Sequence, residues 1–341
     1  MYRLLKLGSR ILLSNFKTLK EPYKLTFSVT DKCNSKCKIC SIWKKKPVNE
    51  LSYEEIKKIF GKINPSWVNI TGGEPFLRND LYEIAEIIQK RGVYLFNITT
   101  NGLLVDKTLD EIKKILNLNF PKVIVVVSLD GPKETHDEIR GMNGSWINSV
   151  NLFKQLKKLS KTRKNFQTYL GYTISKFNLH LIDKTLEDVK REVGVTMKDF
   201  HFNIFHTSSF YYNTHKQQIL PEKDELLEDI NYILKEKGSI GVLSLLERKY
   251  IKLIKEYLDT GKSPMKCKAL VSSCFIASNG DVYPCITFNK KLGNIRESNY
   301  NLKKIWNSEI SFSIRKMIEE NRCDGCWTPC EAYQTILGNL M

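Results

Sequence analysis

The chain has 341 residues, of which 42% are apolar and 27% are charged. This composition excludes a collagenous, low-complexity or wholly disordered protein, and the length suits an α/β barrel with a smaller additional part. Lys and Arg total 54 against 37 Asp and Glu, which gives a formal net charge of +17. The excess of positive charge favours anionic partners such as nucleic acid, a membrane surface or an acidic substrate.

No window of the sequence holds the roughly 18 uninterrupted apolar residues of a membrane span. Arg3, Lys6 and Arg10 interrupt the N-terminal segment, where a signal peptide needs a continuous apolar stretch. We therefore expect a cytoplasmic protein. Because that compartment keeps thiols reduced, the nine cysteines predict metal sites rather than a disulfide framework.

Residues 1–22 are predicted to form a basic amphipathic helix. Its basic residues share one side and its large apolar residues share the other, with only Leu13 breaking the division. Such a helix either packs beneath a barrel or lies in an anionic membrane interface, which would place the protein peripherally at the inner face of the membrane. The apolar side is made by Leu4, Leu5, Leu7, Ile11, Leu12, Phe16 and Leu19.

From residue 23 to residue 210, strand-like runs such as KLTFSVT, WVNIT and KVIVVVSLD alternate with helix-like runs. The alternation predicts parallel strands with crossover helices, and six such units give an α/β fold of the partial (β/α)6, TIM-type barrel kind. Functional residues are then expected at the carboxyl ends of the strands. Residues 211–262 indicate a polar helical connector, and residues 263–341 a small cysteine-rich extension that docks on the barrel.

The first strand-like run is followed by a C-x3-C-x2-C motif made by Cys33, Cys37 and Cys40. A [4Fe–4S] cluster normally takes four thiolates, so three would leave one iron able to bind another ligand. A zinc site would need a fourth His or Cys nearby, and no His lies in the loop or its flanks. The motif therefore indicates a catalytic iron–sulfur site.

Together with the turn after the second strand-like run, this motif resembles the radical S-adenosylmethionine (SAM) enzymes over about residues 23–205. The resemblance implies that the open iron binds SAM, and that an electron cleaves SAM to methionine and a 5′-deoxyadenosyl radical, which abstracts hydrogen from substrate. It also implies a reducing partner such as ferredoxin or flavodoxin. Ile39 stands where the family usually has an aromatic residue. The turn is formed by Gly72, Gly73, Glu74 and Pro75.

Further residues are implied by the resemblance to line the SAM pocket. The two glycines permit a turn with free carbonyls for the SAM amino group, and Glu74 supplies an anionic acceptor. Arg140 matches an arginine that meets the SAM carboxylate, a role that suits a bidentate guanidinium; the alternative is a surface ion pair. The other candidates are Asn101, Ser128, Ile174, Ser175 and Asn178.

Two groups of polar residues are interpreted as structural. Asp130 and His136 are expected to stabilise loops. The residues that follow the sixth strand could face the barrel mouth, but such a group is more often packing than an acid or base, so we name no catalytic acid or base. These residues are His206, Tyr211, Tyr212 and His215.

The extension holds six cysteines and a predicted hairpin around Asn279 and Gly280. It resembles the SPASM or twitch extension of radical SAM enzymes, which implies at least one auxiliary [4Fe–4S] cluster. Six thiolates cannot fully ligate two clusters, so one cluster held by four is the simplest solution; a second cluster with an open iron and structural zinc are alternatives. The expected ligands are Cys285, Cys323 and Cys326, with the fourth chosen from Cys267, Cys274 and Cys330.

The sequence thus predicts a radical SAM oxidoreductase or modifying enzyme that abstracts hydrogen from a peptide, a sugar or alcohol, or a lipid-linked substrate. The auxiliary cluster would accept an electron or position the substrate, which is expected to be anionic or membrane-associated. No nucleic-acid-binding module is recognisable. The alternative is a non-catalytic iron–sulfur or zinc protein, such as an electron carrier, a sensor or a binding module.

Overall fold

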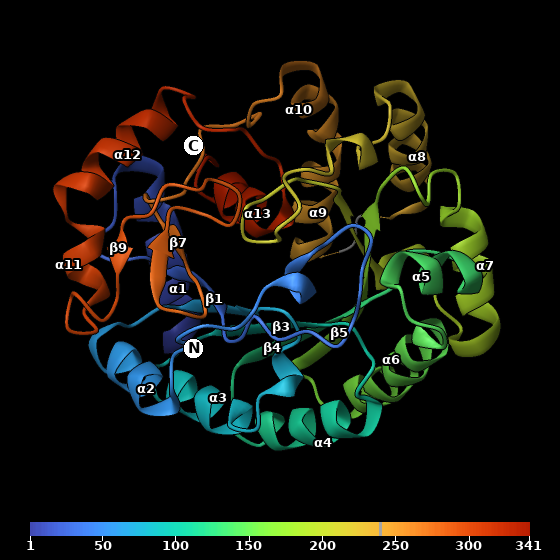
Figure 1. The fold of residues 1–341 in the computed structure, drawn as a ribbon, viewed down its shortest axis with the longest axis horizontal. Coiled ribbons are helices and arrows are strands. Elements are labelled where there is room, and N and C mark those ends of the chain that lie inside the picture. Colours follow the sequence, from blue (N-terminus) through green and yellow to red (C-terminus); the bar gives the residue numbers. More distant parts are fainter. Residues whose placement is uncertain (239–240) are drawn as a thin grey trace.

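The computed structural model describes residues 1–238 and 241–341, and it is built around one sheet in the strand order β6-β5-β4-β3-β2-β1-β7-β8-β9. Strands β1 to β6 pair in parallel and curl into a partial barrel (Figure 1). The α/β fold predicted from the alternating runs is therefore confirmed. The strands are β1 (Lys24–Ser28), β2 (Trp67–Thr71), β3 (Leu95–Thr100), β4 (Lys122–Ser128), β5 (Phe166–Ile174), β6 (Phe200–Ile204), β7 (Ser273–Ile276), β8 (Asp281–Tyr283) and β9 (Gly293–Asn294).

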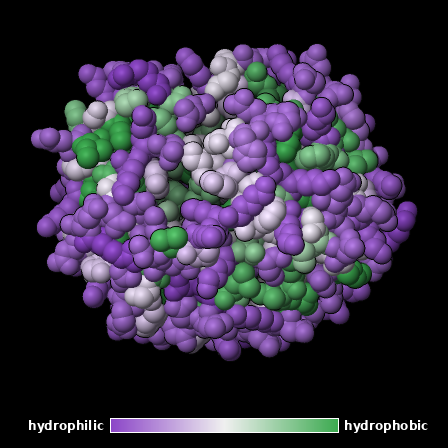
Figure 2. Space-filling model, viewed as in Figure 1, coloured by the Kyte–Doolittle hydropathy of each residue, from purple (hydrophilic) through white to green (hydrophobic). Residues whose placement is uncertain are grey.

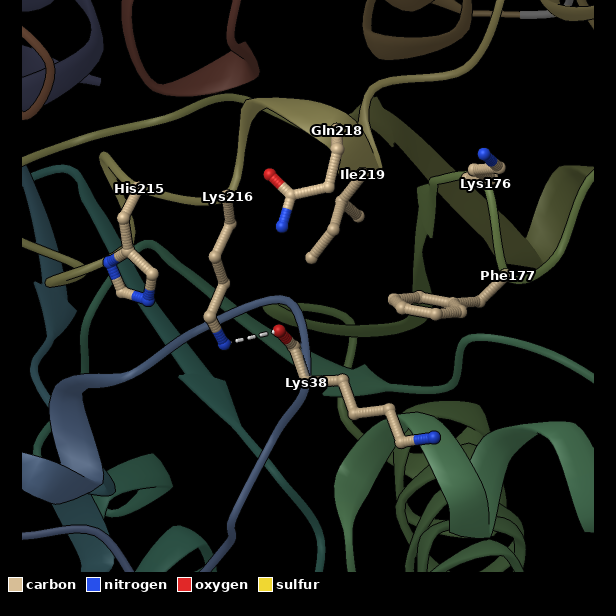
Figure 3. A pocket seen from close by; sticks show the side chains of 7 residues that line it. All are labelled: Lys38, Lys176, Phe177, His215, Lys216, Gln218 and Ile219. Carbon is tan, nitrogen blue, oxygen red and sulfur yellow. Dashed lines mark hydrogen bonds between the residues drawn. The ribbon is translucent and has the colours of Figure 1, made fainter.

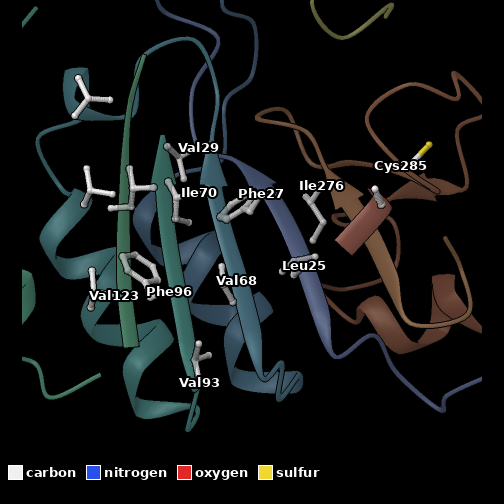
Figure 4. Close-up of a cluster of buried hydrophobic side chains, with 14 of the residues drawn as sticks. Leu25, Phe27, Val29, Val68, Ile70, Val93, Phe96, Val123, Ile276 and Cys285 are labelled. Carbon is white, nitrogen blue, oxygen red and sulfur yellow. The ribbon is translucent and has the colours of Figure 1, made fainter. Parts of the chain in front are cut away.

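Helices connect the parallel strands and cover the outer face of the sheet (Figure 1). Because side chains alternate along a strand, Leu25, Phe27 and Val29 enter the apolar core beneath these helices (Figure 4), and the residues between them face the lumen of the barrel. The covering helices are α2 (Tyr53–Lys62), α3 (Leu81–Lys90), α4 (Val105–Leu116), α5 (Lys133–Arg140), α6 (Ser145–Thr162) and α7 (Ile182–Val193).

The predicted helical connector, residues 211–262, begins with turns, and its helices lie between Lys223 and Thr260; residues 239–240 lie outside the described part. The extension continues the barrel sheet, because β7 pairs in parallel with β1 and places Cys274 opposite Leu25. The cysteine-rich extension, expected to begin at residue 263, is therefore part of the same sheet as the barrel. The later helices are α8 (Lys223–Glu236), α9 (Val242–Lys252), α10 (Ile254–Thr260), α11 (Leu302–Trp306), α12 (Glu309–Glu319) and α13 (Pro329–Leu337). Single 3-10 turns are η1 (Ile42–Lys44), η2 (Pro75–Leu77), η3 (Met197–Asp199) and η4 (Gln217–Ile219).

The N-terminal helix α1 (Tyr2–Phe16) lies under the amino ends of the strands. Leu7 is buried there in an apolar cluster with Trp67 and Leu95, the first residues of β2 and β3, and Ile11 packs against the same cluster. The packing role proposed for this helix is therefore confirmed for these two side chains. Leu19, which follows the helix, is buried in the same cluster, whereas Leu4, Leu5, Leu12 and Phe16 on the expected apolar side are exposed.

The surface seen from the side of Figure 1 is largely hydrophilic, with apolar side chains in scattered patches (Figure 2). Among the helices in the described ranges, none has the length and apolar character needed to cross a membrane.

Candidate functional site

The first three cysteines lie on the loop between β1 and η1, at the carboxyl end of the strand. The loop is held on both sides by main-chain hydrogen bonds. Lys38 N donates to Ile139 O at the end of α5 across 2.7 Å, and Ser41 N donates to Tyr211 O across 2.9 Å. The loop that was predicted to bind a cluster is thus fixed across the mouth of the barrel.

Hydrogen-bond donors surround these thiols. Arg140 Nη1 donates to Cys37 Sγ across 3.7 Å, and Asn101 Nδ2 lies 4.0 Å from Cys33 Sγ. Burial, with a smaller contribution from the neighbouring thiols, raises the pKa of Cys33 to about 11 and that of Cys40 to about 12. Donors aimed at sulfur are what an iron–sulfur cluster uses to balance its charge, so the donor set fits such a cluster.

The turn after β2 is pressed against the cysteine loop. Gly73 N donates to Thr30 O across 2.7 Å, and Glu74 N donates to Lys32 O across 2.8 Å. A Cβ atom on Gly72 would lie 2.4 Å from Thr30 O, and one on Gly73 would lie 2.1 Å from Lys32 O. Glycine is therefore required at both positions by close approach of two backbones.

Glu74 is fully buried, and its carboxylate accepts three hydrogen bonds from groups of the protein. One oxygen accepts hydrogen bonds from Thr100 Oγ1 at 2.9 Å and Phe76 N at 3.2 Å, and the other accepts from Asn101 N at 2.7 Å. A carboxylate offers about four acceptor positions, so one remains for a ligand. Contact between Glu74 and the SAM amino group stays a prediction. Pro75 is buried at the start of η2.

Arg140 forms a buried ion pair with Asp130, with 2.5 Å between Nη2 and Oδ2. The alternative of a surface ion pair is therefore wrong. Arg140 Nε is buried and has no acceptor within the described residues, so this donor could meet the carboxylate of SAM. Asp130 and His136 have the loop-stabilising roles that were expected, because Asp130 Oδ1 accepts from Thr173 N and His136 Nδ1 accepts from Asp130 N.

The remaining SAM candidates differ in what they can reach. Ile174 is fully buried in the apolar core, so a contact of its side chain with adenine is not supported. Ser175 N and Oγ both donate to Asn178 Oδ1, and Asn178 Nδ2 donates to Asp130 O, so these polar groups already have partners within the protein. Ser128 is half-buried at the end of β4, where its role stays a prediction.

A second hollow is lined by four of the six C-terminal cysteines. Backbone amides donate to two of their sulfurs: Ala269 N to Cys267 Sγ across 3.5 Å, and Phe288 N to Cys285 Sγ across 3.3 Å. The fourth ligand left open by the sequence is thus best supplied by Cys267. The four cysteines are Cys267, Cys285, Cys323 and Cys326.

The other two C-terminal cysteines lie elsewhere. Cys274 is buried in the apolar core on β7, and Cys330 packs in a cluster with Cys40, Phe210 and Phe275. Their expected place among the auxiliary ligands is not supported by these positions. Across residues 1–238 and 241–341, no three His, Cys, Asp or Glu side chains are grouped tightly enough to hold a single metal ion.

The lumen between the two thiol sites carries polar groups that the sequence reasoning missed. Asn69, Asn97 and Gln167 occupy one layer of β2, β3 and β5, and Asn97 Oδ1 and Gln167 Oε1 are buried without a partner in the described part of the chain. Asn69 and Asn97 alternate with large apolar residues in their strands, which is the signal that could have identified them.

A basic hollow of about 470 Å³ opens at the mouth beside the cysteine loop (Figure 3). Lys216 Nζ donates to Lys38 O across 2.5 Å, and Lys38 Nζ lies 5.5 Å from the ring centre of Phe177. His215 lines this hollow and is exposed, whereas His206 is half-buried and accepts from Trp327 N, as expected for a packing role. The lining residues are Lys38, Lys176, Phe177, His215, Lys216, Gln218 and Ile219.

Comparison with known proteins agrees with this geometry. The radical SAM superfamily model matches residues 27–189, and the SPASM iron–sulfur cluster-binding domain model matches residues 267–331. The chain is 26% identical to an AdoMet-dependent heme synthase of Methanosarcina barkeri, over 93% of this chain and 90% of the relative. It is 30% identical to a GTP 3′,8-cyclase of Mannheimia succiniciproducens, over 67% of each chain. The structure of Streptococcus suis SuiB bound to its precursor peptide SuiA superposes with a TM-score of 0.63 at 18% identity, covering 95% of this chain and 75% of that one.

The chain belongs to the radical SAM superfamily and carries a C-terminal SPASM domain. It is therefore an enzyme, as the sequence predicted, and the non-catalytic alternative is not retained. Its cofactors are a [4Fe–4S] cluster, SAM and the auxiliary iron–sulfur centre of the SPASM domain.

Proposed function

We propose that this enzyme cleaves SAM reductively at the site of Cys33, Cys37 and Cys40, and abstracts hydrogen from a substrate in the lumen. When bound, the cluster and SAM supply an electron and the 5′-deoxyadenosyl radical. The observation that carries the proposal is the cysteine loop held against the Gly72–Gly73 turn. Around it, Arg140 Nε and one acceptor position of Glu74 remain for the carboxylate and amino groups of SAM.

The SPASM site is proposed to transfer electrons rather than to bind substrate. Four thiols line it, and four thiolates can ligate every iron of one cubane, so no iron is left open for a substrate. An enzyme that passes the electron of a substrate radical to this site would carry out an oxidation. A ferredoxin or flavodoxin would serve as the reducing partner for the first site.

The substrate is proposed to be an anionic molecule with a hydrogen-bonding body. Of the three lysines that line the hollow beside the cysteine loop, Lys38 is paired with Glu138, so Lys176 and Lys216 remain; carboxylates or phosphates are the groups that ammonium side chains bind. The amides of Asn97 and Gln167 in the lumen suit the main chain of a peptide or the hydroxyls of a sugar. A peptide, a sugar or alcohol, and a lipid-linked compound are therefore the substrate classes to compare.

The enzyme is also proposed to be cytoplasmic, because cluster ligands must stay reduced. A peripheral position at the inner face of the membrane would follow from the exposed side of α1.

Anaerobic reconstitution tests the proposed function. We expect about eight irons per chain, from two cubanes of four irons each, and 5′-deoxyadenosine formed under dithionite. Cys37→Ala should lower the iron to about four and abolish SAM cleavage, whereas Cys326→Ser should lower the iron to about four and leave SAM cleavage intact. Cys274→Ser is the matched control and should keep about eight irons. Zinc in place of iron, with SAM intact, would contradict the proposal.

A further inference from the structure

The side of α1 that points away from the protein is apolar. Tyr2 is 77% exposed, Leu5 63% and Phe16 69%, and Leu12 and Leu13 are also more than two-fifths exposed. At about 100° per residue, these residues fall on one face of the helix, so they form a single stripe. Leu7 and Ser14, on the opposite side, are buried against the barrel.

A surface helix normally shows polar residues to the solvent and apolar residues to the core. Helix α1 places apolar residues on both sides, because Leu7 and Ile11 already occupy the packed side. The exposed stripe therefore contributes nothing to the core of this chain. An exposed apolar stripe of this kind, which only Ser9 interrupts, indicates a surface that binds another body.

Positive charge borders the stripe on one side. Residues 1–20 contain five basic residues and no acidic one, and Glu21, the first acid, is already paired with Arg10 and Lys303. Burial, followed by repulsion from Arg10, lowers the pKa of Lys6. Arg3 Nη1 is a buried donor without an acceptor within the described ranges. An anion bound at this edge of the stripe would therefore reduce the electrostatic repulsion among the basic side chains of α1.

We propose that the exposed face of α1 binds the surface of a membrane that contains anionic lipids. Leu5, Leu12 and Phe16 would enter the boundary between headgroups and acyl chains, while Arg3, Lys6 and Lys17 would meet lipid phosphates. This surface specifies the peripheral location proposed above. Because α1 lies beneath the amino ends of the strands, the bound enzyme would keep its cysteine loop and basic hollow directed away from the lipid.

Flotation of the reconstituted full-length enzyme with vesicles tests this inference. We expect binding to vesicles of phosphatidylcholine with phosphatidylglycerol, weaker binding to phosphatidylcholine alone, and a decrease with added salt. Phe16→Glu combined with Leu12→Glu should weaken binding by roughly tenfold or more. Phe312→Glu is the matched control, because Phe312 on α12 is 68% exposed and lies outside the stripe; it should bind as the wild type does.

A second readout places the stripe directly. Phe16→Trp should give a blue shift of its indole emission, and quenching by brominated lipids, on addition of anionic vesicles. Equal vesicle binding by the Phe16→Glu, Leu12→Glu variant and the wild type would overturn the inference. So would light scattering that shows a dimer dissociated by this variant, because the stripe would then belong to a second copy. SAM cleavage without lipid should be equal in all these variants, so this inference can fail while the proposed function stands.

Discussion

Glu74 is a buried carboxylate that ties the ends of two neighbouring strands together. Its acceptors take hydrogen bonds from residues after β2 and at the end of β3, next to the cysteine loop. Burial disfavours the ionised form more than these hydrogen bonds favour it, and it raises the pKa of Glu74 to about 7. The protonation of this residue is therefore expected to change near neutral pH.

The stability of the enzyme should depend on pH through this residue. A carboxyl whose folded pKa is raised stabilises the fold fully below its unfolded pKa of about 4.5, and this contribution is lost as the pH rises through 7. Compared with Glu74→Gln, the wild type should lose roughly 2.5 kcal/mol of unfolding free energy between about pH 5 and pH 8. Urea unfolding followed by circular dichroism at both pH values measures the difference. Parallel pH profiles of the two proteins would show that Glu74 is not the responsible group.

The turn after β2 and the cysteine loop form one structural element although about forty residues separate them. Their backbones approach so closely that only hydrogen atoms fit at positions 72 and 73. Because the loop carries the three thiols, its position depends on the absence of two side chains.

Gly73→Ala should displace the loop, since the added Cβ would lie 2.1 Å from Lys32 O. We expect the iron content to fall from about eight to about four per chain, with loss of SAM cleavage. Gly61→Ala is the control: nothing lies within 4 Å of a Cβ there, and alanine in α2 should stabilise the protein by about 0.5–1 kcal/mol. Full iron content in the Gly73→Ala protein would show that the loop adapts without loss of the site.

At the scale of the whole molecule, the barrel and the SPASM domain share a sheet and a buried polar network. Lys24 on β1 is completely buried, and its Nζ donates to Cys330 O and, across 2.7 Å, to Gln334 Oε1 on α13. Gln334 Nε2 in turn donates to the buried carboxylate of Glu331, which also accepts from Ser273 Oγ. The first strand of the barrel is thus joined to the last helix.

Lys24→Met should destabilise the whole chain by about 3 kcal/mol, because it leaves Cys330 O and Gln334 Oε1 without a donor and the charge of Glu331 without a neighbouring cation. Adding Glu331→Gln should recover part of this loss by removing the buried charge. Thermal unfolding of the two variants and the wild type measures both effects. If Glu331→Gln lowers the stability of the Lys24→Met protein as much as it lowers that of the wild type, the two residues do not act as a pair.

The sequence by itself determined the parallel barrel, the three-cysteine loop and the glycine turn, and the resemblance of these motifs to radical SAM enzymes implied the class of enzyme. These features depend on spacing within a few residues: the alternation of strands and helices, C-x3-C-x2-C, and adjacent glycines. The hydrogen bond from Asp130 N to His136 Nδ1 was also accessible as a loop-stabilising contact, because only six residues separate the two partners.

Only the tertiary structure decided which four cysteines line the second hollow, that β7 extends the barrel beside β1, and that Arg140 pairs with Asp130 inside the protein. It also decided which side of α1 is covered. Each of these depends on which surface of a distant segment packs against the residue concerned. Periodicity in a sequence identifies an apolar side, but burial requires a partner, and the partner is brought close only by the folded chain.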